Sequence, residues 1–410
     1  MLTYLLRRML LMIPTLLGIT IVVFTVMVMS PGGISAQTLV EGADMKPQEK
    51  QALMAYYNKR YGLDQPPPMQ YLRWLNNVSP VGLTQDEAGN YTGFSFTKGM
   101  DLGTSFMYGR PVGEILGERI PITLLLNVIT IPLIYVIAIV VGVRAATDRG
   151  GRFDVGSSVS MLALWSVPTM LAGVLLLGFF ASSQHFHWFP TAGLSEREAQ
   201  DMPFLPHWGS LWDVLKVFGG MLAGMALAIT LSRVLRLGVW WLTSLLLCGA
   251  TAGVIVGMHF SGDGFVRGFL FDRLWHLALP IVCLSYGGFA ALAKLTRTSV
   301  LENLNADYAR TARAKGLAEN DVLWKHVFRN SLLPLITVSA GLLPSLLAGA
   351  LIVENIFSIN GMGQLAVEAV KGRDRELVLS ITWISGFLTL IGYLIADFCY
   401  TLVDPRVSYD

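Results

Sequence analysis

Charged side chains are scarce in this chain of 410 residues: Asp, Glu, Lys and Arg make up 14% of it, against about 25% in a typical globular domain. Hydrophobic residues make up 53%. This balance excludes an ordinary water-soluble domain and predicts a membrane protein. The formal net charge of only +2 gives no sign of nucleic-acid binding, which needs a strongly basic surface.

Motifs for nucleotide binding and hydrolysis are also missing. There is no GxxxxGK[ST] phosphate loop, no HExxH zinc motif and no GxSxG nucleophile. We therefore expect neither an ATPase nor another enzyme, and no catalytic, cofactor or metal site. His185 and His187 alternate like two ligands on one side of an extended segment, but no third ligand is near, and Trp188 favours an interfacial aromatic belt. The three cysteines lie in apolar segments without a CxxC pair: Cys248, Cys283 and Cys399.

Uncharged apolar runs take the place of these motifs. A helix needs about 20 apolar residues to cross the hydrocarbon core. Seven runs suit a span: Leu10–Met29, Ile120–Val143, Val155–Gln184, Leu237–Phe260, Leu274–Ala293, Ser331–Val353 and Leu377–Ala396. Val217–Ser232 is a weaker eighth, which Lys216 and Arg233 could extend by snorkelling. The seven clear runs contain no Asp, Glu, Lys or Arg, although ion-coupled transporters usually carry such residues at mid-membrane.

The distribution of positive charge favours eight spans. Cytoplasmic loops carry an excess of Lys and Arg. If Arg7 and Arg8 are cytoplasmic, eight spans place the segment Lys294–Asn330 inside as well, with its seven basic and four acidic residues. Seven spans would put this basic loop outside. We therefore predict eight spans and two cytoplasmic termini.

The longest segment between runs is Ser30–Glu118, which has mixed charge and many aromatic residues. We expect a small folded outer subdomain, with an amphipathic helix over Pro47–Tyr61 and a proline-rich turn at Gln65–Pro68. Connections between elements usually have about 4–6 residues. A second outer loop, Glu354–Glu376, is therefore also expected to be functional.

The basic loop contains the sequence YARTARAKGL, residues 308–317. Asp307 is a suitable helix cap, and Gly316 suits a left-handed residue at the helix end. Ala309, Ala312 and Arg313 share one helical face, on which small side chains would let another protein approach closely. The simpler alternative is that the loop only determines topology.

A second helix is expected over Glu319–Asn330. Its apolar stripe comprises four residues: Val322, Leu323, His326 and Val327. The two short helices would together form a protein-docking element.

Several blocks of the chain resemble the membrane subunits of binding-protein-dependent ABC importers, in particular the first permease of the dipeptide and oligopeptide type. Asp307–Leu317, followed by Arg329–Pro334, is similar to the EAA loop of that family, with Arg310 at the position of the family's Glu. Other blocks follow in family order: Arg7-Arg8 with Ile13–Thr15, Tyr61–Pro66 with Gln70–Trp74, Asp101–Ser105 with Pro111-Val112 and Pro121–Thr123, Glu354–Ser358 with Gly361–Gly363, Arg373-Asp374, and Asp404–Arg406.

The resemblance implies an all-α polytopic membrane protein: a six-helix ABC importer permease core plus an inserted helical pair, eight spans in all, with an outer subdomain between spans one and two. We expect the inserted pair to form a hairpin at the edge of the bundle, in which glycines of the first helix pack against the second. The expected divisions are 1–30 (first span), 31–118 (outer subdomain), 119–210 (spans two and three with an outer loop), 211–264 (inserted pair) and 265–410 (core with the coupling loop 294–331).

The resemblance also implies the function and the partners. The chain would be one permease subunit in a prokaryotic inner membrane and import peptides or peptide-like compounds through a path shared with a homologous second permease. Two cytoplasmic ABC ATPases would hold ATP and Mg²⁺, and an extracytoplasmic solute-binding protein would deliver the substrate. An ATPase-independent channel or secondary transporter is the alternative. The residues expected to couple to the ATPases are Asp307, Tyr308, Arg310, Thr311, Ala312, Arg313, Ala314, Lys315, Gly316 and Leu317.

Overall fold

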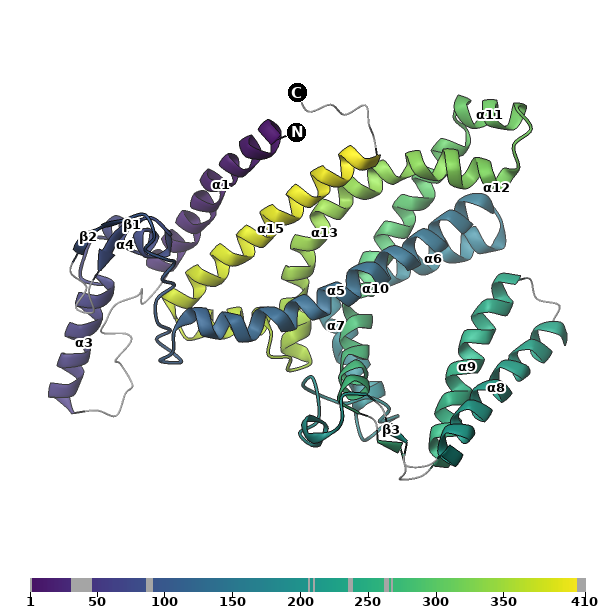
Figure 1. The fold of residues 1–410 in the computed structure, drawn as a ribbon, viewed down its shortest axis with the longest axis horizontal. Helices are drawn as coiled ribbons and strands as arrows, with labels where there is room; N and C mark the ends of the chain where they lie inside the picture. Colours follow the sequence, from purple (N-terminus) through teal and green to yellow (C-terminus); the bar gives the residue numbers. More distant parts are fainter. Residues whose placement is uncertain are drawn as a thin grey trace. The chain divides into compact units, whose positions relative to one another are not determined.

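Helices make up most of the structure (Figure 1). The computed structural model describes residues 2–30, 46–85, 91–205, 207–208, 211–234, 239–261, 265–266 and 268–403. The chain divides into two compact units, Met1–Gly178 with Pro280–Asp410, and Phe179–Leu279.

The first unit contains the two ends of the chain and the basic loop. Its elements are α1 (Leu2–Met29), α3 (Pro47–Tyr61), α4 (Pro67–Val78), β1 (Gly82–Gln85), β2 (Tyr91–Ser95), α5 (Val112–Thr147), α6 (Arg152–Ser166), α7 (Thr169–Leu176), α11 (Asp307–Ala314), α12 (Glu319–Asp321), η4 (Val322–Phe328), α13 (Arg329–Ile356), α14 (Met362–Lys371) and α15 (Arg375–Val403). The second unit contains η2 (Glu198–Asp201), β3 (His207–Trp208), α8 (Leu211–Val234), α9 (Val239–Ser261) and β4 (Phe265–Val266). Two elements cross the division: η1 (Leu177–Ala181) and α10 (Gly268–Leu304).

The helices follow the apolar runs. Within the described residues, five helices are long and apolar enough to cross a membrane, and there are six if the bent pair Arg152–Ser166 and Thr169–Ala181 counts as one span. The five are α1, α5, α8, α10 and α15. α9 and α13 have 23 and 28 residues, also enough for about 30 Å of hydrocarbon at 1.5 Å per residue. The structure is thus mostly helical with several apolar spans, as expected of a polytopic membrane protein.

The run Val155–Gln184 is not one straight helix. α6 and α7 meet at an angle of 94°, because Val167 is extended (φ −82°, ψ 122°) before Pro168, as residues before proline usually are. The break removes helical hydrogen bonds. The hydroxyl of Tyr286 on α10 donates to the carbonyl of Val167 over 2.7 Å, which supplies the partner that a broken backbone needs inside a membrane.

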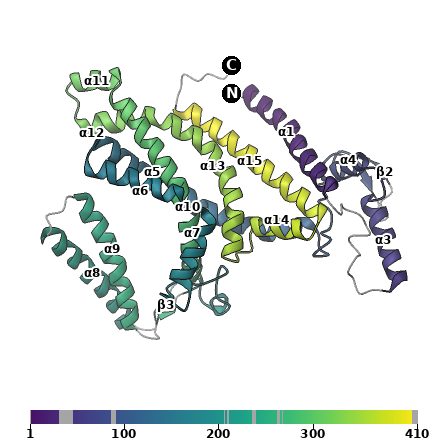
Figure 2. The ribbon, with the colours of Figure 1, turned by 180° about the vertical axis from the view of Figure 1, so that it is seen from behind.

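α1 and α15 pack together along their length (Figure 2). The guanidinium of Arg8 lies 2.8 Å from the carboxylate of Asp397 at one end of the pair. A methyl group at Gly386 would lie 3.0 Å from Leu16, which places the two helices close to each other at mid-length. The first and last spans are therefore neighbours, although they lie at opposite ends of the chain.

The described part of the segment between α1 and α5, residues 46–85 and 91–111, contains two helices and a small sheet. α3 occupies the predicted residues Pro47–Tyr61. The proline-rich stretch Gln65–Pro68 both turns the chain and starts α4, and a two-stranded antiparallel sheet of β1 and β2 follows. α5 begins at Val112, so its helix starts before the uncharged run at Ile120.

α8 and α9 form the predicted hairpin, and glycines form its interface. A methyl group at Gly224 would lie 1.9 Å from the carbonyl oxygen of Gly249, and one at Gly253 would lie 2.1 Å from that of Gly220. Small residues let helix backbones approach closely where lipid provides no hydrophobic driving force. The expectation that glycines of the first helix pack on the second is confirmed.

From the close contact in this hairpin we expect Gly224→Val to lower the stability of the folded protein strongly, because the valine side chain would overlap the backbone of α9. Overpacking of this kind typically costs about 1–3 kcal/mol and occasionally more. Gly219→Val is the matched control, since no atom lies within 4 Å of a methyl group placed there. Thermal unfolding of the purified protein should show a clear loss of stability for the first variant only. Equal unfolding temperatures would contradict the glycine interface.

Candidate functional site

α11 forms the first half of the basic loop, and Figure 1 shows it at the tip of the loop between α10 and α13. The helix begins one residue earlier than a cap at Asp307 would require: Ala306 is the extended residue before the helix (φ −70°, ψ 153°), and Asp307 is its first helical residue. The prediction that Asp307 caps the helix is therefore wrong. Its carboxylate still suits a helix N-terminus and lies 3.5 Å from Arg310.

Just beyond the end of α11, Gly316 has φ +81° and is the predicted left-handed residue. The amide of Gly316 donates to the carbonyl of Arg313 (2.9 Å), and the amide of Leu317 donates to that of Ala312 (3.3 Å). These two bonds are those of a Schellman motif, which uses a left-handed residue to satisfy the last carbonyls of a helix. The glycine therefore fixes the point at which the chain leaves α11.

The small face of α11 is buried against this chain. Ala309 is fully buried and Ala312 is 5% exposed. They pack in one hydrophobic cluster with residues of α5, α10 and η4: Val143, Ala146, Val300, Val322 and Val327. The expectation that this face is open to another protein is wrong, because both alanines are buried inside the chain, where α11 packs against η4.

Polar contacts also hold the loop in place. Arg313 is half-buried, and its guanidinium donates to Glu319 (2.8 Å) and to the carbonyl of Leu304 (3.2 Å). The hydroxyl of Tyr308 donates to the side chain of Asn303, whose amide donates to Ser331 Oγ at 3.1 Å. These bonds join α11 to the end of α10 and the start of α13.

The opposite face of α11 and its C-terminal turn are exposed. The side chain of Arg310 is 70% exposed, and Leu317 is 40% exposed. The other exposed residues of the predicted set are Asp307, Tyr308, Thr311, Ala314, Lys315 and Gly316. Eight of the ten predicted residues thus share an exposed surface, whereas Ala312 and Arg313 support it from behind.

The second half of the loop differs from the expected separate helix over Glu319–Asn330. A short α12 passes into a π-helical segment, η4, which continues into α13. Val322 and Val327 are buried as predicted, but His326 is exposed. Sequence reasoning missed Trp324, which is 44% exposed. The sequence could have indicated this residue, because a tryptophan stands out in a basic loop that lies outside the apolar runs.

A buried carboxylate fixes the turn between α13 and α14. Glu354 is fully buried and accepts hydrogen bonds from the Thr123 hydroxyl (2.7 Å) and from the amides of Gly363 (2.7 Å) and Gln364 (3.0 Å). A methyl group at Gly361 would lie 2.5 Å from this carboxylate. The motif Gly361–Gly363 is therefore needed for space and for amide donors.

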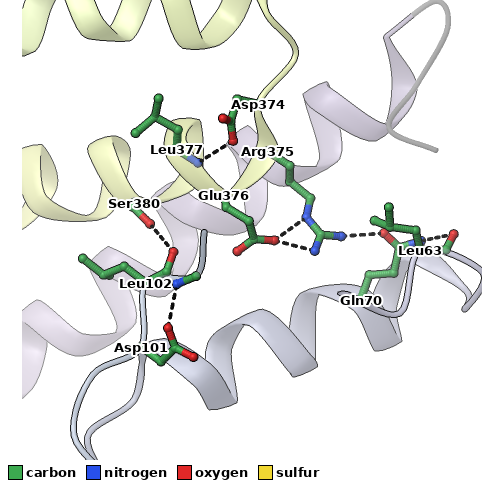
Figure 3. A network of polar contacts seen from close by, with 10 residues as sticks. Leu63, Gln70, Asp101, Leu102, Asp374, Arg375, Glu376, Leu377 and Ser380 are labelled. Carbon is green, nitrogen blue, oxygen red and sulfur yellow. Dashed lines mark hydrogen bonds and ion pairs between the residues drawn. The ribbon is translucent and has the colours of Figure 1, made fainter. Parts of the chain in front are cut away.

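A second buried network joins the start of α15 to the subdomain that precedes α5 (Figure 3). Arg375 is 2% exposed and donates to Glu376 (2.9 Å) and to the side-chain oxygen of Gln70 (3.0 Å). Asp374 accepts from the hydroxyl of Ser105 at 2.6 Å. The outer loop Glu354–Glu376 therefore has a largely buried frame, and its exposed part is mainly residues 370–373.

Tyr108 adds a contact from the subdomain to α14. Its hydroxyl donates to Glu368 at 2.6 Å. Burial, followed by this hydrogen bond, raises the pKa of Tyr108 above its usual value. The side chain therefore stays neutral and a donor at physiological pH.

Metal-ligating side chains do not gather elsewhere in the described part of the chain: no group of three or more His, Cys, Asp or Glu there could hold a metal ion. In the second unit His187 Nδ1 lies 3.1 Å from the carbonyl of Ala181. Phe186 and Trp188 are more than half exposed, as the aromatic-belt interpretation requires.

Comparison with known proteins identifies the family. Residues 138–409 match the model of the binding-protein-dependent transport system inner membrane component, and residues 1–127 match the N-terminal model of the same kind of membrane component. The chain belongs to this family. It is thus a permease subunit of a binding-protein-dependent ABC importer, without an ATPase site of its own.

Relatives match the permease along its whole length. The oligopeptide transport system permease protein AppB of Bacillus subtilis is 32% identical over 410 residues, with 100% of both chains covered. The peptidoglycan transport system permease protein YejB of Agrobacterium fabrum is 28% identical, with 99% of this chain and 98% of the relative covered. The inner membrane ABC transporter permease protein YejB of Escherichia coli O157:H7 is 27% identical, with 99% of both covered.

The Schellman turn predicts different outcomes for two substitutions at Gly316. Proline cannot adopt a φ of +81° and removes the amide that donates to Arg313, so Gly316→Pro should cost about 3 kcal/mol locally. Gly316→Asn should be tolerated, because asparagine populates the left-handed region and no atom would touch its Cβ. Amide hydrogen exchange of residues 311–317 should accelerate about 100-fold for proline only. Equal exchange in both variants would contradict the turn's role.

Proposed function

We propose that the exposed face of α11 is the ATPase-docking surface of an ATP-driven importer of peptides or peptide-like compounds. The proposal rests on one observation: one face of α11 is buried and the other is exposed. Its alanine face is buried against α5, α10 and η4, and its other face presents Arg310, Lys315 and Leu317. A surface of this kind combines charge for orientation with an apolar side chain for affinity.

The buried side of α11 makes it suitable for transmitting motion. A methyl group at Gly142 of α5 would lie 2.5 Å from Thr296 Cβ of α10, so these two helices are in close contact beside the cluster under α11. Packed interiors deform little. A displacement of α11 by the ATPases would thus be passed to α5 and α10. Coupling also requires that the contacts between the ATPases and α11 differ between the two states of the transporter.

We infer eight spans with both termini in the cytoplasm, a topology supported by the distribution of positive charge. In this topology α8 and α9 would supply the pair of spans that residues 211–264 add to the six-span core. With this topology α11 and the turn between α5 and α6 are cytoplasmic, and the α13–α14 turn is on the opposite side. The divisions 1–30, 31–118, 119–210, 211–264 and 265–410 follow this topology.

The complete transporter would contain two different permeases, two ATPases and a solute-binding protein. This permease forms half of the path with its homologue and binds no cofactor, since ATP and Mg²⁺ belong to the ATPases. The solute-binding protein would sit on residues 31–118 together with the exposed part of 354–376. The subdomain's basic residue Lys46 is exposed there and suits a transient, charge-steered contact.

Peptides are the favoured substrate class because AppB is named as an oligopeptide permease. Vesicles that contain the assembled transporter and its binding protein should accumulate labelled oligopeptides on addition of ATP. Unlabelled oligopeptides should compete, whereas sugars and single amino acids should not. Uptake of a labelled peptide that is insensitive to ATP would favour an ATPase-independent transporter instead.

The docking proposal predicts that Arg310→Glu combined with Lys315→Glu uncouples the permease. Replacing one side of a close charge pair at an interface typically costs about 2 kcal/mol or more, so the apparent affinity for the ATPases should fall at least about tenfold. Arg149→Glu is the matched control, since Arg149 is an exposed arginine in the turn between α5 and α6. ATPase binding to the reconstituted permease, measured at low and high salt, checks this. Wild-type binding by the double variant would contradict the docking surface.

A further inference from the structure

The surface of α4 is unusual for a helix outside the bilayer. Its only charged residue is Arg73, which is 9% exposed. Its large exposed side chains are Met69 (54%) and Leu72 (55%), three residues apart on one face. A helix in water normally exposes charged and polar residues opposite its buried face; α3, by contrast with α4, exposes Glu49.

The N-terminus of α4 is built without free amide donors. The first four amides of a helix have no partner within it, and each would be costly in hydrocarbon. Here Pro66, Pro67 and Pro68 carry no N–H. The next two amides, of Met69 and Gln70, both donate to the carbonyl of Pro66, at 2.9 and 3.2 Å. This helix end therefore needs no water.

Two polar side chains of α4, Gln70 and Asn76, are paired within the protein. The Gln70 amide donates to the carbonyls of Gln65 (2.9 Å) and Leu63 (3.3 Å), while its oxygen accepts from Arg375. Asn76 exchanges two hydrogen bonds of 2.8 Å with the backbone of Leu83. These two polar side chains therefore do not need water, and the exposed face of α4 is left to apolar residues.

Contacts with α1 place α4 at membrane depth. The hydroxyl of Tyr71 lies 2.9 Å from that of Thr20, and its ring lies 5.4 Å from the ring of Phe24. Thr20 is nine residues before the end of α1 at Met29, which corresponds to about 14 Å along the helix. The hydrocarbon core is about 30 Å thick. Tyr71 therefore reaches well into the layer that α1 crosses.

We propose that α4 is embedded in the bilayer leaflet around the Met29 end of α1, with Met69 and Leu72 against lipid acyl chains. The inference is independent of ATPase docking and of the substrate. α1 exposes apolar side chains at the same level, since Val22 and Val26 on either side of Phe24 are 62% and 63% exposed. Lipid acyl chains match such a surface because these four exposed side chains carry neither a charge nor a hydrogen-bonding group.

Fluorescent labelling of the assembled transporter in nanodiscs tests this location. Leu72→Cys and, separately, Met69→Cys are labelled with bimane after Cys248, Cys283 and Cys399 are replaced by alanine and uptake is shown to persist. Val26→Cys serves as the lipid reference. Gln51→Cys, at an exposed position on α3, serves as the aqueous reference. Quenching is measured with nitroxide-labelled lipids and with iodide.

The proposal expects both α4 labels to behave as the Val26 label does. Nitroxide lipids should quench them strongly, and iodide should quench them several-fold less than the Gln51 label. Strong iodide quenching with little lipid quenching would overturn the proposal in favour of an aqueous face. Protection from both quenchers would overturn it in favour of a face covered by a partner protein.

Discussion

The contact between the alanine face of α11 and the inner side of α5, α10 and η4 is the constraint on which the coupling loop depends. Ala309 and Ala312 have no side chain beyond Cβ, so the helix can pack into the cluster that also contains Val143 and Val300. Larger residues would lift α11 away and expose the cluster. The basic residues on the other face owe their position to this packing, since they have few contacts of their own.

Buried polar clusters supply a comparable constraint at the α13–α14 turn and the start of α15. Glu354 and Arg375 are nearly inaccessible to solvent, and several donors or acceptors hold each of them. Buried charged groups are stable only when they are paired and hydrogen-bonded. The residues of the outer loop that resemble family motifs are therefore mainly structural, and any partner surface must be sought among the exposed residues around them.

The sequence predicted those features that depend on local chemistry. The bounds of α3, the conformation of Gly316 and the glycine contacts of α8 with α9 all follow from residue types at short spacing. It did not predict the buried side of α11, because a stripe of alanines suits an internal core as well as a partner protein. The bend at Val167 was also missed, since counting apolar residues ignores the restriction that Pro168 imposes. Neither the π-helical turn of η4 nor the depth of α4 has a signal in composition, because both depend on contacts between distant segments.

The central claim is that α11 moves with α5 as one body. Spin labels at Thr311→Cys on the exposed face and at Thr147→Cys at the exposed end of α5 report the distance between them by pulsed electron resonance. The account predicts the same distance distribution in the nucleotide-free transporter and in the transporter trapped with ATP, while the distance from Thr311 to the same position in the partner permease changes. A shift of the Thr311–Thr147 distance between the two states would contradict it, because α11 would then move independently of the helix on which it rests.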